Sequence, residues 1–488
     1  MAMPQLNNNQ LIAQFQDFRN KIYKCFSSCS DACMDLLDAL AGNTDANSIV
    51  ELSLNPSFQR SYNSIYKAIK ESFNTSESDK NDDEDKLNTS SELIRTVSQL
   101  IEKPQQRPFY LFATDTTPHP RPYAKTLSDR GYIYQPNTVK GNKPINIGHS
   151  YSLLSILPEK VTDNDGTWAV PLSGERVSLK TNGVDIASKQ IQVVMSDSSL
   201  PWYKKLSVLV GDTAFSKRQF LFEQSQHDNL VVIARCRSNR VFYQSPPIEE
   251  LNKKRGCPKK YGERFDLGDA ETWHSPDETT LVQQTTRKGR ILNVNIQAWH
   301  QMLMRGTKYQ KMYHHPFTLI RIHVTDDTCS TVWKPMWLIV MGNKREEISL
   351  TVAYSCYRQR FDIEHMLRFG KQRLLMTQFQ TPDVEHEENW IQFVLLAYVQ
   401  LWAAKDLATH LPKPWERYLK QNNDKIVTPS VVQRDFQRII SEIGTPARSP
   451  KTRGNSIGRA QGQIQRRRTK QPVVKKQSKA TPENQKSA

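Results

Sequence analysis

Two aspartates stand where a strand could hold a carboxylate at the edge of a sheet. The apolar segment 109–113 runs into Asp115 in ATDTT, and the apolar segment 206–210 runs into Asp212 in GDTAF. A lone aspartate at such a place most often starts a turn or caps a helix. Two of them with a glutamate would supply hard oxygen ligands for Mg²⁺ or Mn²⁺. Paired ions at such a site can activate water and stabilise the leaving oxygen in phosphoryl transfer.

A candidate for the third carboxylate lies in the segment 357–372, YRQRFDIEHMLRFGKQ, where acidic residues stand among basic ones. Read as a helix with about 100° of rotation per residue, four side chains share a stripe about 60° wide: Tyr357, Arg360, Glu364 and Lys371. Asp362 points away from this stripe, and we expect it to tolerate replacement better than Glu364. The stripe has two interpretations, a surface charge ladder or a metal ligand whose neighbours hold DNA phosphates.

The elements that must position these residues have the pattern of an α/β core. Short apolar runs predict strands at 109–113, 132–134, 168–170, 206–210 and 230–234. A helix is predicted around 185–198, further strands at 317–324 and 336–341, and helices from 350 to about 443. Strands that alternate with helices are typical of α/β folds.

The flanking parts of the chain have a different character. Residues 1–104 predict a helical N-terminal domain that contains an acidic loop at 74–90. Residues 376–444 predict C-terminal helices, and the basic segment 445–488 is expected to be a disordered tail because it has little to bury.

Charge is distributed unevenly along the chain. The net charge is +17, yet residues 1–104 contain 10 Lys/Arg and 15 Asp/Glu, which leaves +22 for the remainder. The last 44 residues hold 12 basic side chains and one acid. Basic charge concentrated in this way favours a polyanionic partner, most often nucleic acid.

No apolar run reaches the roughly 20 residues that a membrane-spanning helix needs. Seven cysteines, an odd number, fit reduced thiols, so we expect a cytoplasmic protein without a membrane partner.

The spacing Tyr357-x2-Arg360-x3-Glu364-x6-Lys371 resembles the tyrosine–arginine–glutamate–lysine signature of bacterial insertion-sequence DDE transposases. All four residues stand at the expected spacing, and the resemblance covers about 105–375. It implies a ribonuclease-H-like catalytic core.

The resemblance also implies the roles of particular residues. Asp115, Asp212 and Glu364 would be the catalytic triad and would hold two Mg²⁺ ions, for which Mn²⁺ would substitute. The tyrosine, arginine and lysine of the signature would contact the DNA backbone beside the cleavage site.

Relatives in this group carry a β-rich insertion between the second aspartate and the glutamate. Here the insertion is expected at about 240–315, with the last core strand within 317–341. The insertion contains KKRGCPKKYG (253–262), which resembles a degraded AT-hook and is better read as a phosphate-binding loop. Its basic residues are Lys253, Lys254, Arg255, Lys259 and Lys260.

Two tryptophans of the insertion, Trp273 and Trp299, have a further possible use. Some relatives stack an insertion tryptophan on a flipped base. Without a partner motif, both are interpreted as packing residues.

The function implied by the resemblance is cut-and-paste DNA transposition. Its partners would be double-stranded DNA with terminal inverted repeats, target DNA, and a second copy of the chain on DNA, within a bacterial nucleoid. Two alternatives stay open: a structure-selective nuclease on the same fold, and a non-enzymatic DNA-binding protein derived from a transposase.

Overall fold

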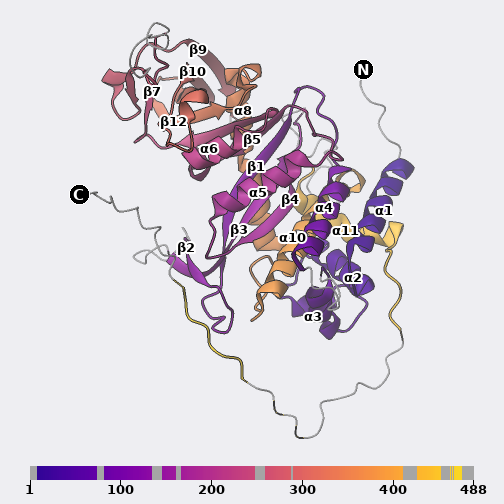
Figure 1. The fold of residues 1–488 in the computed structure, drawn as a ribbon. Coiled ribbons are helices and arrows are strands. Elements are labelled where there is room, and N and C mark those ends of the chain that lie inside the picture. Colours follow the sequence, from indigo (N-terminus) through magenta and orange to yellow (C-terminus); the bar gives the residue numbers. More distant parts are fainter. Residues whose placement is uncertain are drawn as a thin grey trace, which may run out of the picture.

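A mixed sheet of ten strands runs through the protein (Figure 1). The computed structural model describes residues 8–73, 82–134, 145–160, 166–247, 259–286, 289–409, 426–451, 462, 464 and 467–474. The strand order is β2-β3-β1-β5-β6-β12-β11-β10-β9, and β4 pairs with β3 on the same edge as β2. Within the described residues no helix is both long and apolar enough to span a membrane.

The central strands explain where the aspartates lie. They are β1 (Tyr110–Pro120), β2 (Gly131–Tyr134), β3 (Ile145–Leu157), β4 (Val170–Val177), β5 (Ser207–Gly211) and β6 (Leu230–Cys236). Strand β1 pairs antiparallel with β3 and parallel with β5, and β5 pairs parallel with β6. The strands predicted at 109–113, 132–134, 206–210 and 230–234 are present. The one predicted at 168–170 lies mostly before β4, and β3 was not predicted. The whole is a mixed α/β fold compatible with a ribonuclease-H-like DDE core.

Helices cover both faces of these strands. On β3, the Ser152 hydroxyl donates to Gln190 of α5 (Gly183–Ser196) at 3.0 Å. The neighbouring Tyr151 donates to Glu387 of α10 (Val384–Ala403) at 2.9 Å. Because successive side chains of a strand point to opposite faces, α5 and α10 lie on opposite sides of the sheet.

The strands of the insertion continue the same sheet. They are β9 (Glu278–Thr285), β10 (Ile291–Met302), β11 (Phe317–Asp326) and β12 (Thr331–Met341), all in antiparallel pairs, and β12 joins the edge of β6. A small second sheet pairs β7 (Val241–Tyr243) with β8 (Arg264–Asp266). The strands expected within 317–341 are present as β11 and β12, which pair with β10, with each other and with β6. The expected boundary between core and insertion stays a prediction.

The N-terminal and C-terminal helices pack together instead of forming separate layers. They are α1 (Asn8–Cys25), α2 (Ser30–Ala41), α3 (Tyr62–Glu71), α10 and α11 (Pro429–Ile443). A buried ion pair of 2.5 Å joins Arg19 of α1 to Asp38 of α2. The Gln400 amide of α10 also donates to Asp38, at 2.8 Å. A sequence-based division at residue 104 thus separates helices that share one core.

Two predicted disordered regions contain ordered segments. The expected acidic loop at 74–90 overlaps helix α4 (Asp82–Ser98), which begins at a run of acidic residues. Negative charge is favourable at a helix N-terminus because the helix dipole is positive there. In the expected tail, residues 467–474 lie along the segment that leads into β2, where the Val474 amide donates to the Arg130 carbonyl at 3.0 Å.

Candidate active site

Strand register brings Asp115 and Asp212 into one row. Ala113 of β1 pairs with Val210 of β5, so two residues further on Asp115 lies beside Asp212. Asp115 is not at a strand end as expected, because β1 continues to Pro120 in its pairing with β3. Asp212 does end its strand, and its side chain accepts a hydrogen bond of 2.8 Å from the Ala214 amide.

Two consecutive helices bring the signature residues to this row. They are α8 (Leu350–Gln359) and α9 (Phe361–Arg373), and α9 packs on β1 while α8 packs on β5 and β6. Arg360 joins the two helices and itself has helical backbone angles, φ −49° and ψ −33°. The helical path is therefore nearly continuous, and the predicted stripe of side chains faces the sheet.

Arg360 connects the carboxylates. Its Nη2 donates to Oε1 of Glu364 at 2.6 Å, and its Nη1 lies 3.8 Å from Oδ2 of Asp115. The guanidinium carbon lies 5.5 Å from the ring centre of Tyr357 and 5.0 Å from that of Phe361. A guanidinium between two aromatic rings is held in place by cation–π attraction. Arg360 is thus a buried cation shared by two acidic side chains.

The electrostatics of the row follow from burial and like charge. Burial raises the pKa of Asp115 to about 6; the Thr116 amide and Arg360 oppose this rise, and Asp212 and Glu364 add to it. Burial lowers the pKa of the Lys371 ammonium, and the nearby Asp115 opposes that change. The site therefore concentrates negative charge that a cation would stabilise.

Residues 21–306 match the sequence model of the DDE superfamily endonucleases, over more than half of the 488 residues. The chain belongs to this family. The match includes Asp115 and Asp212 and ends before Glu364. No protein with a curated function matches the chain.

A DDE endonuclease acts on DNA and generally depends on divalent metal. The oxygen donors of the row are the type that Mg²⁺ and Mn²⁺ prefer. The raised pKa of Asp115 and its pairing with Arg360 both indicate a site in need of positive charge. Among the described residues no three acidic, histidine or cysteine side chains are grouped closely enough to hold an ion. The carboxylates fit a divalent cation by their chemistry, and in this structure the Arg360 guanidinium lies between Asp115 and Glu364.

The predicted DNA-contact residues fall into three groups. Tyr357 and Arg360 are 3% and 6% exposed, so they form the floor of the site rather than its rim. Lys259 and Lys260 of the insertion are exposed, and the Lys260 ammonium lies 4.9 Å from the ring centre of Tyr313. Three further insertion residues lie outside the described residues: Lys253, Lys254 and Arg255.

The insertion tryptophans pack against aromatic neighbours. Trp299 is 1% exposed, and its ring centre lies 5.2 Å from that of Phe265 and 5.6 Å from that of Trp337. The ring of Trp273 is stacked on Phe265 at 6.0 Å. This arrangement agrees with the packing interpretation. The exposed tryptophan of the insertion is Trp333, which the sequence did not single out.

Asp362 differs from the expectation that it tolerates replacement. Its side chain is buried, and its Oδ2 lies 2.6 Å from Nζ of Lys160. The helical angle correctly placed Asp362 outside the stripe that holds Arg360 and Glu364. The other side of α9 is covered too, so pointing away from the site does not mean pointing into solvent.

Sequence reasoning missed Arg235, which is exposed beside the row. Gly211 pairs with Ala234, so the next residues, Asp212 and Arg235, lie side by side on neighbouring strands. Arg235 also lies near Tyr357, since its charge lowers the pKa of that phenol against the rise that burial causes. The signal in the sequence was a basic residue directly after an apolar strand.

A buried network around Glu387 was also missed. The carboxylate accepts hydrogen bonds from Nε of Arg121 at 2.6 Å and from Tyr151 at 2.9 Å, and it lies 2.7 Å from Nδ1 of His149. Burial opposes ionisation of Glu387, yet the hydrogen bond to His149 and the charges of His119, His149 and Arg121 lower its pKa to about 2. His119 of β1 also belongs to the network, with its Nε2 3.7 Å from Oε2 of Glu387. Since Asp115 and His119 are an even number of residues apart on β1, the network lies on the face that carries Asp115. It ties β1 to α10.

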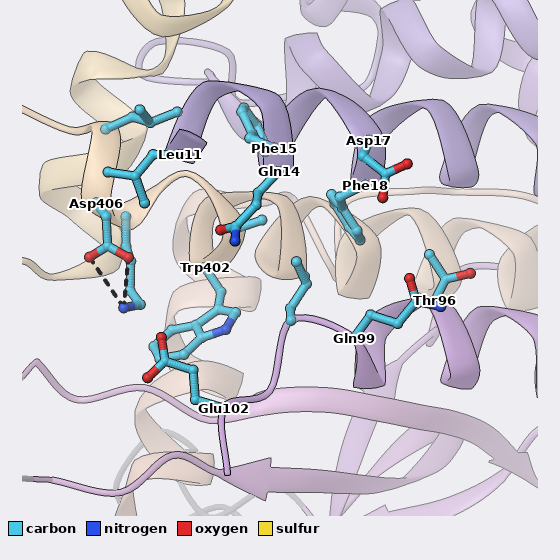
Figure 2. Close-up of a pocket in the computed structure, with 14 residues that line it drawn as sticks. Leu11, Gln14, Phe15, Asp17, Phe18, Thr96, Gln99, Glu102, Trp402 and Asp406 are labelled. Carbon is cyan, nitrogen blue, oxygen red and sulfur yellow. Dashed lines mark hydrogen bonds and ion pairs between the residues drawn. The ribbon is translucent and has the colours of Figure 1, made fainter. Parts of the chain in front are cut away.

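A cavity of about 450 Å³ lies away from this row, between α1 and the ends of α4 and α10 (Figure 2). Its lining includes Phe15, Phe18 and Trp402 together with Asp17 and Glu102. Apolar and acidic side chains do not favour a DNA backbone, and none of the predicted site residues lines the cavity.

Proposed function

We propose that this chain is a cut-and-paste DNA transposase, which binds the ends of a mobile element and catalyses strand cleavage and strand transfer. The observation that carries the proposal is the row of Asp115 and Asp212 on neighbouring strands, with Arg360 joining Asp115 to Glu364. Membership of the DDE superfamily endonucleases supports it. The spacing of the four signature residues supports the insertion-sequence type.

The three carboxylates would hold two Mg²⁺ ions, or Mn²⁺ in their place. These ions supply activation of water and charge stabilisation of the leaving oxygen in an in-line phosphoryl transfer. The pKa of Asp115 is about 6, so its carboxyl group is largely ionised at neutral pH and could bind a metal ion.

Arg360 has a second use when DNA is present. A guanidinium binds a phosphate through two parallel hydrogen bonds, and the stacking of Tyr357 and Phe361 limits where Arg360 can lie. Lys371 is near enough to Asp115 for the two charges to interact. These basic groups would hold the scissile phosphate over the acidic row and offset its charge.

The partners in this proposal are double-stranded DNA with terminal inverted repeats and a target duplex. A homodimer on DNA would bring the two ends together, and the bacterial nucleoid would be the setting. The freed 3′-OH would attack either the opposite strand, which forms a hairpin, or the target directly.

The decisive test compares Glu364→Gln with the wild type and with His365→Gln, an exposed neighbour on the same helix. DNA that carries candidate terminal repeats is incubated with Mg²⁺, and the cleaved strands are mapped. Glu364→Gln should bind the ends and lose nicking, because an amide is a poor metal ligand, whereas His365→Gln should cut normally. Full nicking by Glu364→Gln would refute the proposal. Cleavage of branched junctions in preference to linear ends would favour a structure-selective nuclease.

A further inference from the structure

The C-terminal segment 467–474 is docked on an edge of the sheet. Its Gln471 amide donates to the Lys125 carbonyl at 2.9 Å, and its Val474 amide donates to the Arg130 carbonyl at 3.0 Å. Val474 also forms a parallel bridge with Gly131, the first residue of β2. Figure 1 shows β2 and α11 at separate places in the molecule.

A side-chain anchor fixes the same segment. Arg468 donates to both oxygens of Asp383, at 2.7 and 3.3 Å, just before α10 begins. Two backbone bonds, one of them within the strand bridge, and one forked ion pair make a defined docking contact. Most residues of the segment are exposed, yet these contacts hold it against the surface at residues 468, 471 and 474.

The surface around the docked segment combines basic and aromatic side chains. Tyr132 and Tyr134 of β2 are 55% and 65% exposed and point to the same side of the strand. The exposed basic residues are Lys125, Arg467 and Lys470, and none of the three has an ion-pair partner in the part of the chain that the structure describes. Lysine, arginine and tyrosine are residue types that contact DNA phosphates.

Nearby acidic groups are already neutralised. Asp383 is paired with Arg468, and Asp129 is paired with Arg176, which also binds Glu388. The charge that remains free on this surface is therefore positive.

The surface lies along β1 from the catalytic row. Pro120 is five residues beyond Asp115 on β1; it pairs with Gly148, which in turn pairs with Gly131. At about 3.3 Å per residue, this places the docked segment roughly 17 Å from Asp115 along the strand. That length corresponds to about five base pairs of duplex at 3.4 Å each.

We propose that β2, the turn at 123–125 and the docked segment 467–474 together bind duplex DNA that flanks the cleavage site. The proposal rests on the proposed function for the identity of the DNA. The docked tail is part of the binding surface: it adds Arg467 and Lys470 beside Lys125 and covers an edge that would otherwise end at β2.

The first experiment measures binding of the full chain to a fluorescein-labelled 40-base-pair duplex of mixed sequence in EDTA at several salt concentrations. The variant K125Q/R467Q/K470Q should reduce the slope of log K against log [salt] by about 2–3, because each lost phosphate contact reduces it by about 0.9. The matched control K475Q/K476Q/K479Q removes the same charge from beyond the docked segment and should reduce the slope by less than 1. Equal losses would show that the tail acts only as a charged tether and would overturn the proposal.

The second experiment tests the docking contact itself. Asp383→Asn removes a negative charge, so simple electrostatics predicts tighter DNA binding. Loss of the Arg468 anchor predicts weaker binding instead, and we expect a several-fold decrease in affinity. Val474→Pro, which lacks the N–H that donates to Arg130, should act in the same direction without touching α10. Unchanged or tighter binding by both variants would refute the role of docking.

These measurements are independent of catalysis, because they are made without divalent metal. If the proposed function is wrong, the wild type will not nick DNA. The slopes of log K against log [salt] do not depend on that result. Light scattering measures the oligomeric state of the same variants. If K125Q/R467Q/K470Q lost a dimer while its DNA slope stayed that of the wild type, the surface would be an interface between two copies, and the proposal would fall.

Discussion

Arg360 donates to Glu364 across one turn of helix, Nη2 to Oε1 at 2.6 Å, and the same guanidinium lies 3.8 Å from Asp115. The arginine thus offsets the repulsion between carboxylates that come from a strand and a helix. In the proposed mechanism, a metal ion held by those carboxylates would free the arginine to bind a phosphate. One residue therefore links the metal-free and DNA-bound forms of the proposed site.

Replacement of Arg360 by lysine should reduce nicking by about 10²–10³-fold, which is the usual cost of removing one preorganised charge-stabilising donor. Lysine keeps the charge but lacks the planar fork that binds phosphate and stacks on Tyr357. The matched control is Arg358→Lys, an exposed position two residues earlier. Comparable rates for both variants, measured by gel assay at saturating Mg²⁺, would remove Arg360 from the mechanism.

Asp115→Asn should stabilise the metal-free protein at neutral pH. The pKa of Asp115 is raised from 3.8 to about 6, so ionisation is unfavourable in the folded state, and stability is lost as pH rises through about 6. A rise of this size corresponds to about 2–3 kcal/mol at pH 7.5. Urea unfolding in EDTA should show the gain at pH 7.5 and little gain at pH 4.

Asp327→Asn provides the control, because Asp327 is exposed and should leave the unfolding free energy unchanged. If Asp115→Asn gave the same free energy as the wild type at both pH values, the carboxyl group would not be strained in the folded state.

Asp362→Ala should destabilise the fold by about 1–3 kcal/mol, because it removes a buried side chain and leaves Lys160 without its partner. His365→Ala, exposed on the same helix, should remain within about 0.5 kcal/mol of the wild type. The test compares the free energies of unfolding of Asp362→Ala, His365→Ala and the wild type, measured by thermal or urea unfolding. A value for Asp362→Ala as small as that for His365→Ala would support the expectation from sequence that this position is tolerant.

Glu387→Gln should reduce the free energy of unfolding by about 3–5 kcal/mol, since it leaves the buried guanidinium of Arg121 without a countercharge. Glu388→Gln is the matched control: Glu388 is partly exposed and binds Arg176 at the surface. The pKa of Glu387 is lowered to about 2, so its contribution is present above pH 4.5 and is lost as pH falls towards 2. Acid unfolding of Glu387→Gln should therefore show a weaker dependence on pH than that of the wild type over this range.

The local features of this protein were readable from its sequence. A helix repeats every 3.6 residues, so spacing alone predicted that Arg360 and Glu364 share a face, and the structure joins them by a hydrogen bond. Apolar runs predicted β1, β5 and β6, and with them the positions of Asp115 and Asp212. The alternating α/β pattern predicted the fold class.

Relations between distant segments were decided only by the tertiary structure. The spacing of α9 does not reveal that Lys160 covers Asp362, and the tail's composition does not reveal a docking edge at Arg130. The network of Glu387 joins residues more than two hundred positions apart. Helical spacing depends on bonds within one segment, whereas burial and strand pairing depend on which segments meet. That is why the sequence by itself determined which candidate site residues share a helix face or follow an apolar strand, and only the folded chain decided their partners.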